Sequence, residues 1–303
     1  MQLDIFEHSR DVMLRNDVLQ ALDRLDATRA RACWETLALA YPHDDALPAL
    51  FSLIEATAAH GRHAKPPIVL VDHAALAQAQ LALTQELAPA VQRLMDTPRA
   101  RVWLLSFWRS LIERSAHLPY LAEAPSQHVA PMLLHIHDWQ GAQEAVARIE
   151  SWRRIPTPLA WMTQARLNQL GLQASWPLVA ELAWLSPRRL NALMQTASDP
   201  ILKGLAMQFD AEFDARAQET GSPTEPDADL AWIPAWVLTA RPQLAHHLAL
   251  AQAGNHSAPE QAMRLLVNLL GLERQGRHHD IVSHRKRLRD LHPGLYVNYI
   301  KTR

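Results

Sequence analysis

The sequence predicts an all-α fold of stacked antiparallel helix pairs, an α-solenoid, with an irregular helical bundle as the alternative for its middle part. Residues of high helix propensity recur throughout, and only nine glycines occur in 303 residues. The twenty prolines fall mostly in clusters between segments of apolar periodicity. Helix breakers placed in this way are typical of many helices joined by short turns.

Helical periodicity is clearest in two segments of the chain. One face of residues 26–41 carries four side chains at helical spacing: Ala30, Trp34, Leu37 and Tyr41. Residues 99–117 are apolar around most of the helix that they predict, so we expect other helices to surround it nearly completely. The short apolar run at 68–71 is interpreted as a loop or a helix start, because a lone strand has nothing to pair with.

The composition changes most sharply at residues 217–229, AQETGSPTEPDAD. This stretch is acidic and contains a glycine and two prolines, which indicates a flexible linker or a long exposed loop. We therefore expect a helical-repeat or bundle region at 1–216, the acidic linker at 217–229 and a C-terminal helical region at 230–303. A second, weaker candidate boundary is the segment AEAPSQHVAP around Gln127.

Composition also limits the classes of function. Thirty basic and 31 acidic residues leave a net charge of −1, so no overall field attracts the chain to nucleic acid or to an anionic membrane. The single cysteine, Cys33, permits no internal disulfide, and we expect it to be a small core residue of a cytoplasmic protein. The N-terminus does not read as a secretory signal. Without an uncharged apolar run of about 18 residues, we expect no membrane insertion.

The most regular helical hairpin is predicted at residues 259–293. Gly276 lies at the expected turn, and Pro293, which cannot continue a helix, follows 17 positions later (293 − 276). Residues 259–274 supply the preceding helix, and the helix after the turn carries Ile281, His284, Leu288 and Leu291 on one side. The hairpin resembles a tetratricopeptide repeat. That resemblance implies stacked helix pairs with a concave surface for a protein or peptide.

Two further segments are similar to parts of the same repeat. Residues 25–42 have the same separation of 17 positions (42 − 25) and place Ala30 and Trp34 at the family's small and aromatic positions. Leu25, however, stands where the turn glycine belongs. Residues 138–152 resemble the second helix of a repeat, but their closing proline is out of register.

Sixteen histidines suggest a metal site as an alternative. The densest group is His135, His137 and Asp138, with His128 upstream, and these ligand types suit zinc and other first-row metals. The corresponding alternative function is a metal-dependent phosphohydrolase of the all-helical His-Asp type. Residues two apart point to different helix faces and HExxH is absent. We therefore expect no metal, no cofactor and no catalytic residue, since nucleophile and phosphate-loop motifs are also missing.

The densest basic segment lies in the predicted C-terminal hairpin. Arg285, Lys286 and Arg289 project away from the apolar stripe and form one expected solvated face. Nucleic-acid binding through this helix is a second alternative function, although the net charge makes nucleic acid an unfavoured partner. We include the three residues as candidates for binding an acidic partner surface.

The favoured function is a non-catalytic interaction, scaffold or adaptor protein with a protein or peptide partner. Some members of the resembled family bind a peptide's C-terminal carboxylate with a basic residue and an asparagine on first helices. If residues 11–25 form such a helix, Arg15 matches the basic position, but Leu19 occupies the asparagine position and Asn16 lies on an adjoining face. The hypothesis is that Arg15 and Asn16 bind a partner rather than support the fold.

Overall fold

The computed structural model describes residues 10–62, 68–197, 199–213, 227–276 and 278–302. It is 81% helical, and the described part of the chain contains no strand. Helices that follow one another in sequence pack as neighbouring pairs, so the predicted all-α helical-repeat fold is confirmed. The chain divides into two compact units, residues 1–136 and 137–303.

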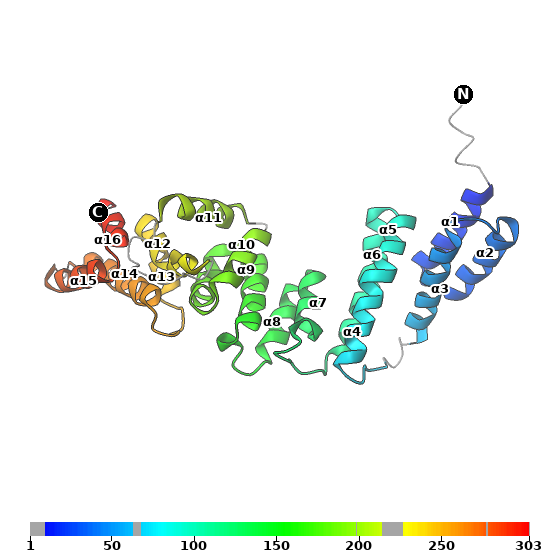
Figure 1. Cartoon of the computed structure of the whole chain (residues 1–303), viewed down its shortest axis with the longest axis horizontal. Coiled ribbons are helices and arrows are strands. Elements are labelled where there is room, and N and C mark those ends of the chain that lie inside the picture. The colour runs from blue at the N-terminus through cyan, green and yellow to red at the C-terminus, as the bar shows by residue number, and fades with distance from the viewer. Residues whose placement is uncertain (1–9, 63–67, 198, 214–226, 277, 303) are drawn as a thin grey trace, which may run out of the picture. The chain divides into compact units, whose positions relative to one another are not determined.

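Unit 1 begins with three helices that lie side by side (Figure 1). Its elements are α1 (Arg10–Asp23), α2 (Ala27–Ala40), α3 (Leu47–Arg62), α4 (His73–Leu81), the π-helical segment η1 (Ala82–Leu87), α5 (Ala88–Leu94), α6 (Thr97–Ser115), the short 3-10 helix η2 (Pro125–Gln127) and α7 (Val129–His135). A core of apolar side chains from α1, α2, α3, α5 and α6 fills the space between them. Cys33, predicted as a core residue, is only partly buried and packs against the edge of this core.

Unit 2 contains the remaining helices. They are α8 (Trp139–Ala147), η3 (Trp152–Arg154), α9 (Pro156–Leu185), α10 (Pro187–Thr196), α11 (Pro200–Glu212), η5 (Ala228–Trp232), α12 (Ile233–Ala240), η6 (Pro242–Leu244), α13 (Ala245–Leu248), α14 (Ala258–Gln275), α15 (His278–Leu291) and α16 (Pro293–Lys301). The helix α9 is interrupted at Gly171, so its parts 156–170 and 172–185 are separate helical segments. The second of these, with Trp176 and Leu178, is among the most deeply buried segments of the unit.

The predicted C-terminal hairpin corresponds to α14 and α15. Gly276 ends α14 in the left-handed conformation, with φ of 69°, and Pro293 begins α16 after the end of α15. The N-terminal pair α1 and α2 has the analogous turn at Leu25, which adopts φ of 54° without being glycine. Left-handed backbone is unfavourable for a residue with a Cβ atom. Leu25 nevertheless adopts the left-handed conformation that a glycine would adopt at this turn, and its side chain packs against the core.

Two expectations concerning α6 and the loop before α4 have different outcomes. Residues 68–71 are loop, as predicted, and are fixed to α6 by hydrogen bonds from Leu70 N to Arg114 O (3.0 Å) and from Arg114 Nε to Ile68 O (2.9 Å).

The expectation that other helices nearly surround α6 is wrong. Trp103 and Leu111 are buried, but Val102 is exposed and most of the other apolar side chains of α6 are only partly buried, because the helices in contact with α6, chiefly α5 and α7, cover only part of its surface.

Most of the expected linker at 217–229 lies outside the described residues, which resume at Asp227. Asp227 accepts a hydrogen bond from Asn191 Nδ2 (3.0 Å), and the segments before and after the gap, α9, α10 and η5, pack together in unit 2. The division between the two compact units falls a few residues after the weaker candidate boundary at 122–131. In the part of the chain with assigned structure, every helix is too short or too polar to cross a membrane.

Candidate functional site: an apolar groove in unit 1

A groove of about 610 Å³ lies in unit 1 between α3, the α4–η1 segment and α6. Each of the three contributes a stripe of side chains at helical spacing. The stripes are Phe51, Ser52, Glu55, Ala56, Ala59 and His60 from α3; Ala79, Ala82, Leu83, Glu86 and Leu87 from α4 and η1; and Phe107, Ser110, Leu111 and Arg114 from α6. A stripe in which residues recur every three or four positions follows one face of a helix. The groove therefore runs along the helices.

Small side chains open the groove. Ala56 and Ala59 face it from α3, and Ala79 and Ala82 face it from the opposite wall. Alanine ends at Cβ, so four such positions leave space that larger apolar residues would fill. Other positions of α3 turn away from the groove, and their buried side chains Leu53 and Ile54 belong to the core of unit 1. One face of α3 therefore makes the stabilising core contacts, and another face borders the groove.

The π-helical segment η1 shapes the second wall of the groove. It continues α4 without a break and supplies Leu83, Glu86 and Leu87 to the lining. A π-helical turn holds an extra residue and so changes the direction of the side chains that follow it. Thr84 Oγ1 bonds back to Gln80 O (2.8 Å) within this segment. Such irregular turns are infrequent and occur often at functional sites.

The polar residues lie at the border of the groove. Glu55 pairs with Arg31, whose guanidinium also lies 5.6 Å from the ring centre of Phe51. Glu86 is exposed on the opposite wall. An apolar floor with charges at the margin is the arrangement of protein surfaces that bind another protein.

His60 and Arg114 close one end of the groove. The His60 ring packs against Phe107 with 4.7 Å between ring centres. Burial lowers the pKa of the His60 imidazole, and the charge of Arg114 lowers it further, against the opposing charge of Glu113. Burial also lowers the pKa of Arg114, which nevertheless stays charged because guanidinium is such a weak acid. At neutral pH the imidazole is uncharged and extends the apolar surface.

The sequence-predicted candidates on α1 lie away from this groove. Arg15 Nε donates to Asp44 Oδ2 at 2.6 Å, and its guanidinium is also 3.4 Å from Asp11. The Asp44 side chain is only 2% exposed, and its other oxygen accepts from Ala46 N (2.8 Å). The ion pair therefore fixes the α2–α3 turn to α1. Asn16 is exposed, whereas Leu19, which occupies the asparagine position of the resembled family, is buried in the core.

Replacing Arg15 with alanine is expected to lower the free energy of unfolding by about 1–2 kcal/mol, because a buried carboxylate loses its charged partner. Asn16→Ala, on the exposed side of the same helix, is the control and should change stability by less than about 0.5 kcal/mol. Urea denaturation of both variants measures the difference. Equal stabilities, combined with weaker partner binding by Arg15→Ala, would contradict the structural role and support partner binding by Arg15.

The basic residues of α15 do not share one environment. Arg285 turns inward: its guanidinium donates to Glu273 Oε1 (3.2 Å) and lies 3.3 Å from the Tyr299 hydroxyl, which itself donates to Glu273. Lys286 is exposed, and Arg289 is exposed beside Asp290, with 3.8 Å between Nε and Oδ1. Arg285 thus joins α14, α15 and α16, and only Lys286 and Arg289 of the three remain on the predicted solvated face.

The histidine group has local structural roles. His128 is buried and caps α7, accepting from Ala130 N (3.2 Å), and Asp138 caps α8, accepting from Gly141 N (2.9 Å). The rings of His135 and His137 pack on Trp108 and Trp139 respectively. Among the residues with described positions, no group of three or more His, Cys, Asp or Glu side chains is arranged to hold a metal ion.

The groove was not predicted from the sequence. The only signal in the sequence is the spacing of two pairs of alanines, at 56 and 59 and at 79 and 82, which would place each pair on one face of a helix. Alanine is also the best helix former, so this pattern does not distinguish an open groove from a close helix contact.

Comparison with family models, curated proteins and solved structures finds no match to the chain.

Proposed function

We propose that this protein is a non-catalytic adaptor whose unit 1 binds an amphipathic helix of a partner protein in the groove between α3, α4–η1 and α6. The observation that carries the proposal is a groove of about 610 Å³ with an apolar floor and charged margins. Helix-in-groove recognition uses such surfaces, and the partner helix places residues at i, i+3, i+4 and i+7 into them.

The dimensions favour a short helical segment. The α3 stripe extends from Phe51 to His60, nine residue steps, or about 13 Å at 1.5 Å per residue. That length corresponds to two or three turns of a bound helix. The alanine floor permits close approach of the partner's backbone, while Phe51, Leu87 and Phe107 supply larger apolar surface at the walls. Burying apolar surface is the main source of affinity in this mode.

The charged side chains at the groove determine the orientation of the bound partner helix. Glu86 is exposed on one wall, whereas Glu55 on the opposite wall is already paired with Arg31, and Arg114 lies at the end closed by His60. A partner helix with a basic residue facing Glu86, and an acidic residue or its C-terminal carbonyls near Arg114, would complement these charges.

Filling the groove is expected to abolish partner binding without unfolding the protein. Ala79→Trp places an indole in the groove, and Ala74→Trp places the same indole at an exposed position of α4 outside the groove. Both variants and the wild type are used as baits in extracts of the native host, with circular dichroism to establish that each is folded.

The proposal expects at least one protein to be retained by the wild type and by Ala74→Trp and lost with Ala79→Trp. A photo-crosslinking residue at Glu86 should then join that protein through a predicted amphipathic helix, whereas one at Gln92, on an exposed position of α5, should not. Identical sets of bound proteins for the two tryptophan variants would contradict the proposal.

A further inference from the structure

His60 is the one histidine among the described residues that line the groove of unit 1. It belongs to the last part of α3, and its side chain is partly buried. The ring packs against Phe107 of α6, with 4.7 Å between the ring centres. The imidazole is therefore part of the surface that a bound segment contacts. Imidazole is also the side chain whose charge changes most readily near neutral pH.

The charged groups around His60 come from every wall of the groove. Glu113 and Arg114 of α6 act on the imidazole with opposite signs, and the effect of Arg114 is the larger. Glu55 of α3 is already in an ion pair, and Glu86 lies on the α4–η1 wall. Protonation of His60 thus places a second positive charge beside Arg114. Glu113 offsets that charge only in part, because its own side chain is exposed to solvent, which screens it.

The imidazole is uncharged at neutral pH. Burial lowers the pKa of His60, and Arg114 lowers it further. Since the ordinary pKa of histidine is about 6.5, the charged form becomes abundant only in more acidic solution. A charged imidazole must keep its water, because burying an unpaired charge is costly. An apolar segment bound over the ring removes that water. Binding and protonation therefore oppose each other.

We propose that protonation of His60 weakens the binding of apolar partner segments in the groove of unit 1, so that the groove empties as the solution becomes acidic. This inference rests on the proposed function, because it concerns the regulation of the same groove. Its magnitude is limited by linkage to one proton. An occupant that binds only the neutral imidazole loses at most about tenfold in affinity for each pH unit below the midpoint of the free protein.

Nile red, an uncharged apolar dye, is the probe, and its fluorescence measures binding to the whole chain at about pH 8 and about pH 5. Carboxylates with an ordinary pKa of about 4 stay largely ionised over this range, so His60 is the lining group that titrates. We expect the wild-type affinity to fall by about threefold or more at the lower pH. Ala79→Trp, which fills the groove, measures dye binding elsewhere, and circular dichroism establishes that each protein is folded at both pH values.

Three variants separate the imidazole from other causes. His60→Phe keeps an aromatic ring against Phe107 and cannot be charged, so its affinity should be the same at both pH values. Arg114→Gln removes the charge that lowers the pKa of His60, and the midpoint of the pH dependence should rise. Glu113→Gln removes the opposing charge, and the midpoint should fall. The imidazole resonance that is missing from the ¹H–¹³C spectrum of His60→Phe should titrate with the same midpoints. A purely structural role of His60 predicts neither shift.

The measurement distinguishes failure of this inference from failure of the proposed function. Equal dye binding by wild type and Ala79→Trp at about pH 8 would contradict an apolar binding groove, on which the proposed function depends. Dye binding that is lost in Ala79→Trp supports the groove. If the wild type then bound equally at the two pH values, or if His60→Phe lost as much affinity as the wild type, the pH inference alone would be overturned.

Discussion

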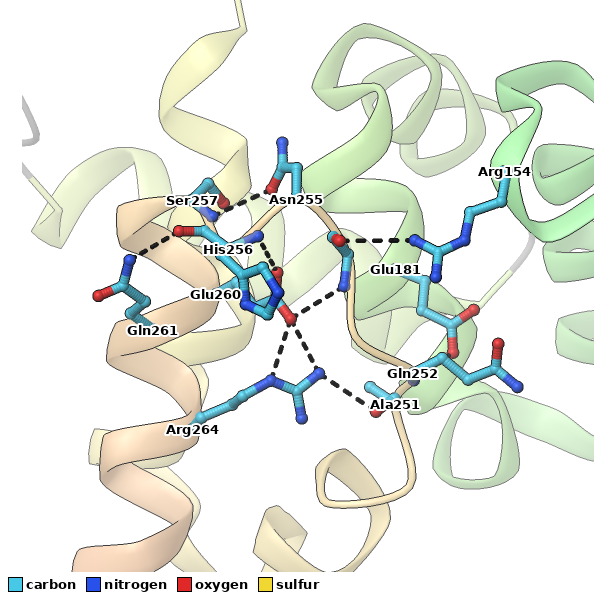
Figure 2. A network of polar contacts seen from close by, with 11 residues as sticks. Arg154, Glu181, Ala251, Gln252, Asn255, His256, Ser257, Glu260, Gln261 and Arg264 are labelled. Atoms are coloured by element: carbon cyan, nitrogen blue, oxygen red, sulfur yellow. Dashed lines mark hydrogen bonds and ion pairs between the residues drawn. The ribbon is translucent and has the colours of Figure 1, made fainter.

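Replacing Glu260 with alanine is expected to lower the free energy of unfolding by about 3 kcal/mol or more. The carboxylate is fully buried and accepts from two backbone amides, Gly254 N and His256 N, as well as from Arg264 (Figure 2). Alanine leaves both amides without an acceptor and the guanidinium without its counter-ion, and each such loss is costly in a buried site. Urea denaturation followed by tryptophan fluorescence measures the change.

Glu260→Gln is the matched control for charge, because glutamine keeps one acceptor and the length of the side chain. We expect it to destabilise less than alanine. Gln261→Ala, next to Glu260 on the exposed side of α14, should have a small effect. If Glu260→Ala and Gln261→Ala had similar stabilities, the carboxylate would not be what holds the loop that contains Gly254 and His256.

The same carboxylate gives the stability of unit 2 a dependence on pH. Burial acts to raise the pKa of Glu260, but the hydrogen bonds from Gly254 N, Arg264 and His256 N outweigh burial and lower it. A carboxyl group whose pKa is lower in the folded than in the unfolded protein stabilises the fold above its unfolded pKa. This stabilisation is lost as the pH falls through the folded pKa. Glu260→Gln should therefore lose less stability on acidification than the wild type.

Gly171→Ala is expected to destabilise unit 2 by about 1–3 kcal/mol. Gly171 has φ of 80° and ψ of 175°, a conformation that is essentially confined to glycine, and it separates the two helical parts of α9. A Cβ atom at this position would meet no other atom within 4 Å. The whole cost therefore comes from the backbone, and the thermal midpoint and the urea midpoint should both fall.

Gly204→Ala provides a control of opposite sign. Gly204 lies at an exposed position within α11, and a Cβ atom there also meets nothing within 4 Å. Alanine is favoured over glycine inside a helix by about 0.5–1 kcal/mol, so this variant should be more stable than the wild type. A stabilising effect of Gly171→Ala as well would mean that α9 continues straight through residue 171.

The sequence by itself determined the local elements of the fold. Gly276 and Pro293 bounded the last helical hairpin because each acts through its own backbone: glycine adopts positive φ readily, and proline cannot continue a helix. Apolar spacing in residues 26–41 similarly predicted α2, in which Ala30 and Leu37 are buried. These properties depend on a residue and its near neighbours, so they can be read without knowing the rest of the chain.

Tertiary structure alone decided which charged and small side chains are available for binding. Arg15 was a candidate for a partner's carboxylate, yet its acceptor is Asp44, 29 residues away in sequence. Arg285 likewise meets Glu273 and Tyr299 from the helices on either side of it. The alanines of α3 and α4–η1 border a groove because of how these helices pack with α6. Periodicity tells which face a residue occupies, whereas the partner of that face is set by packing between distant segments.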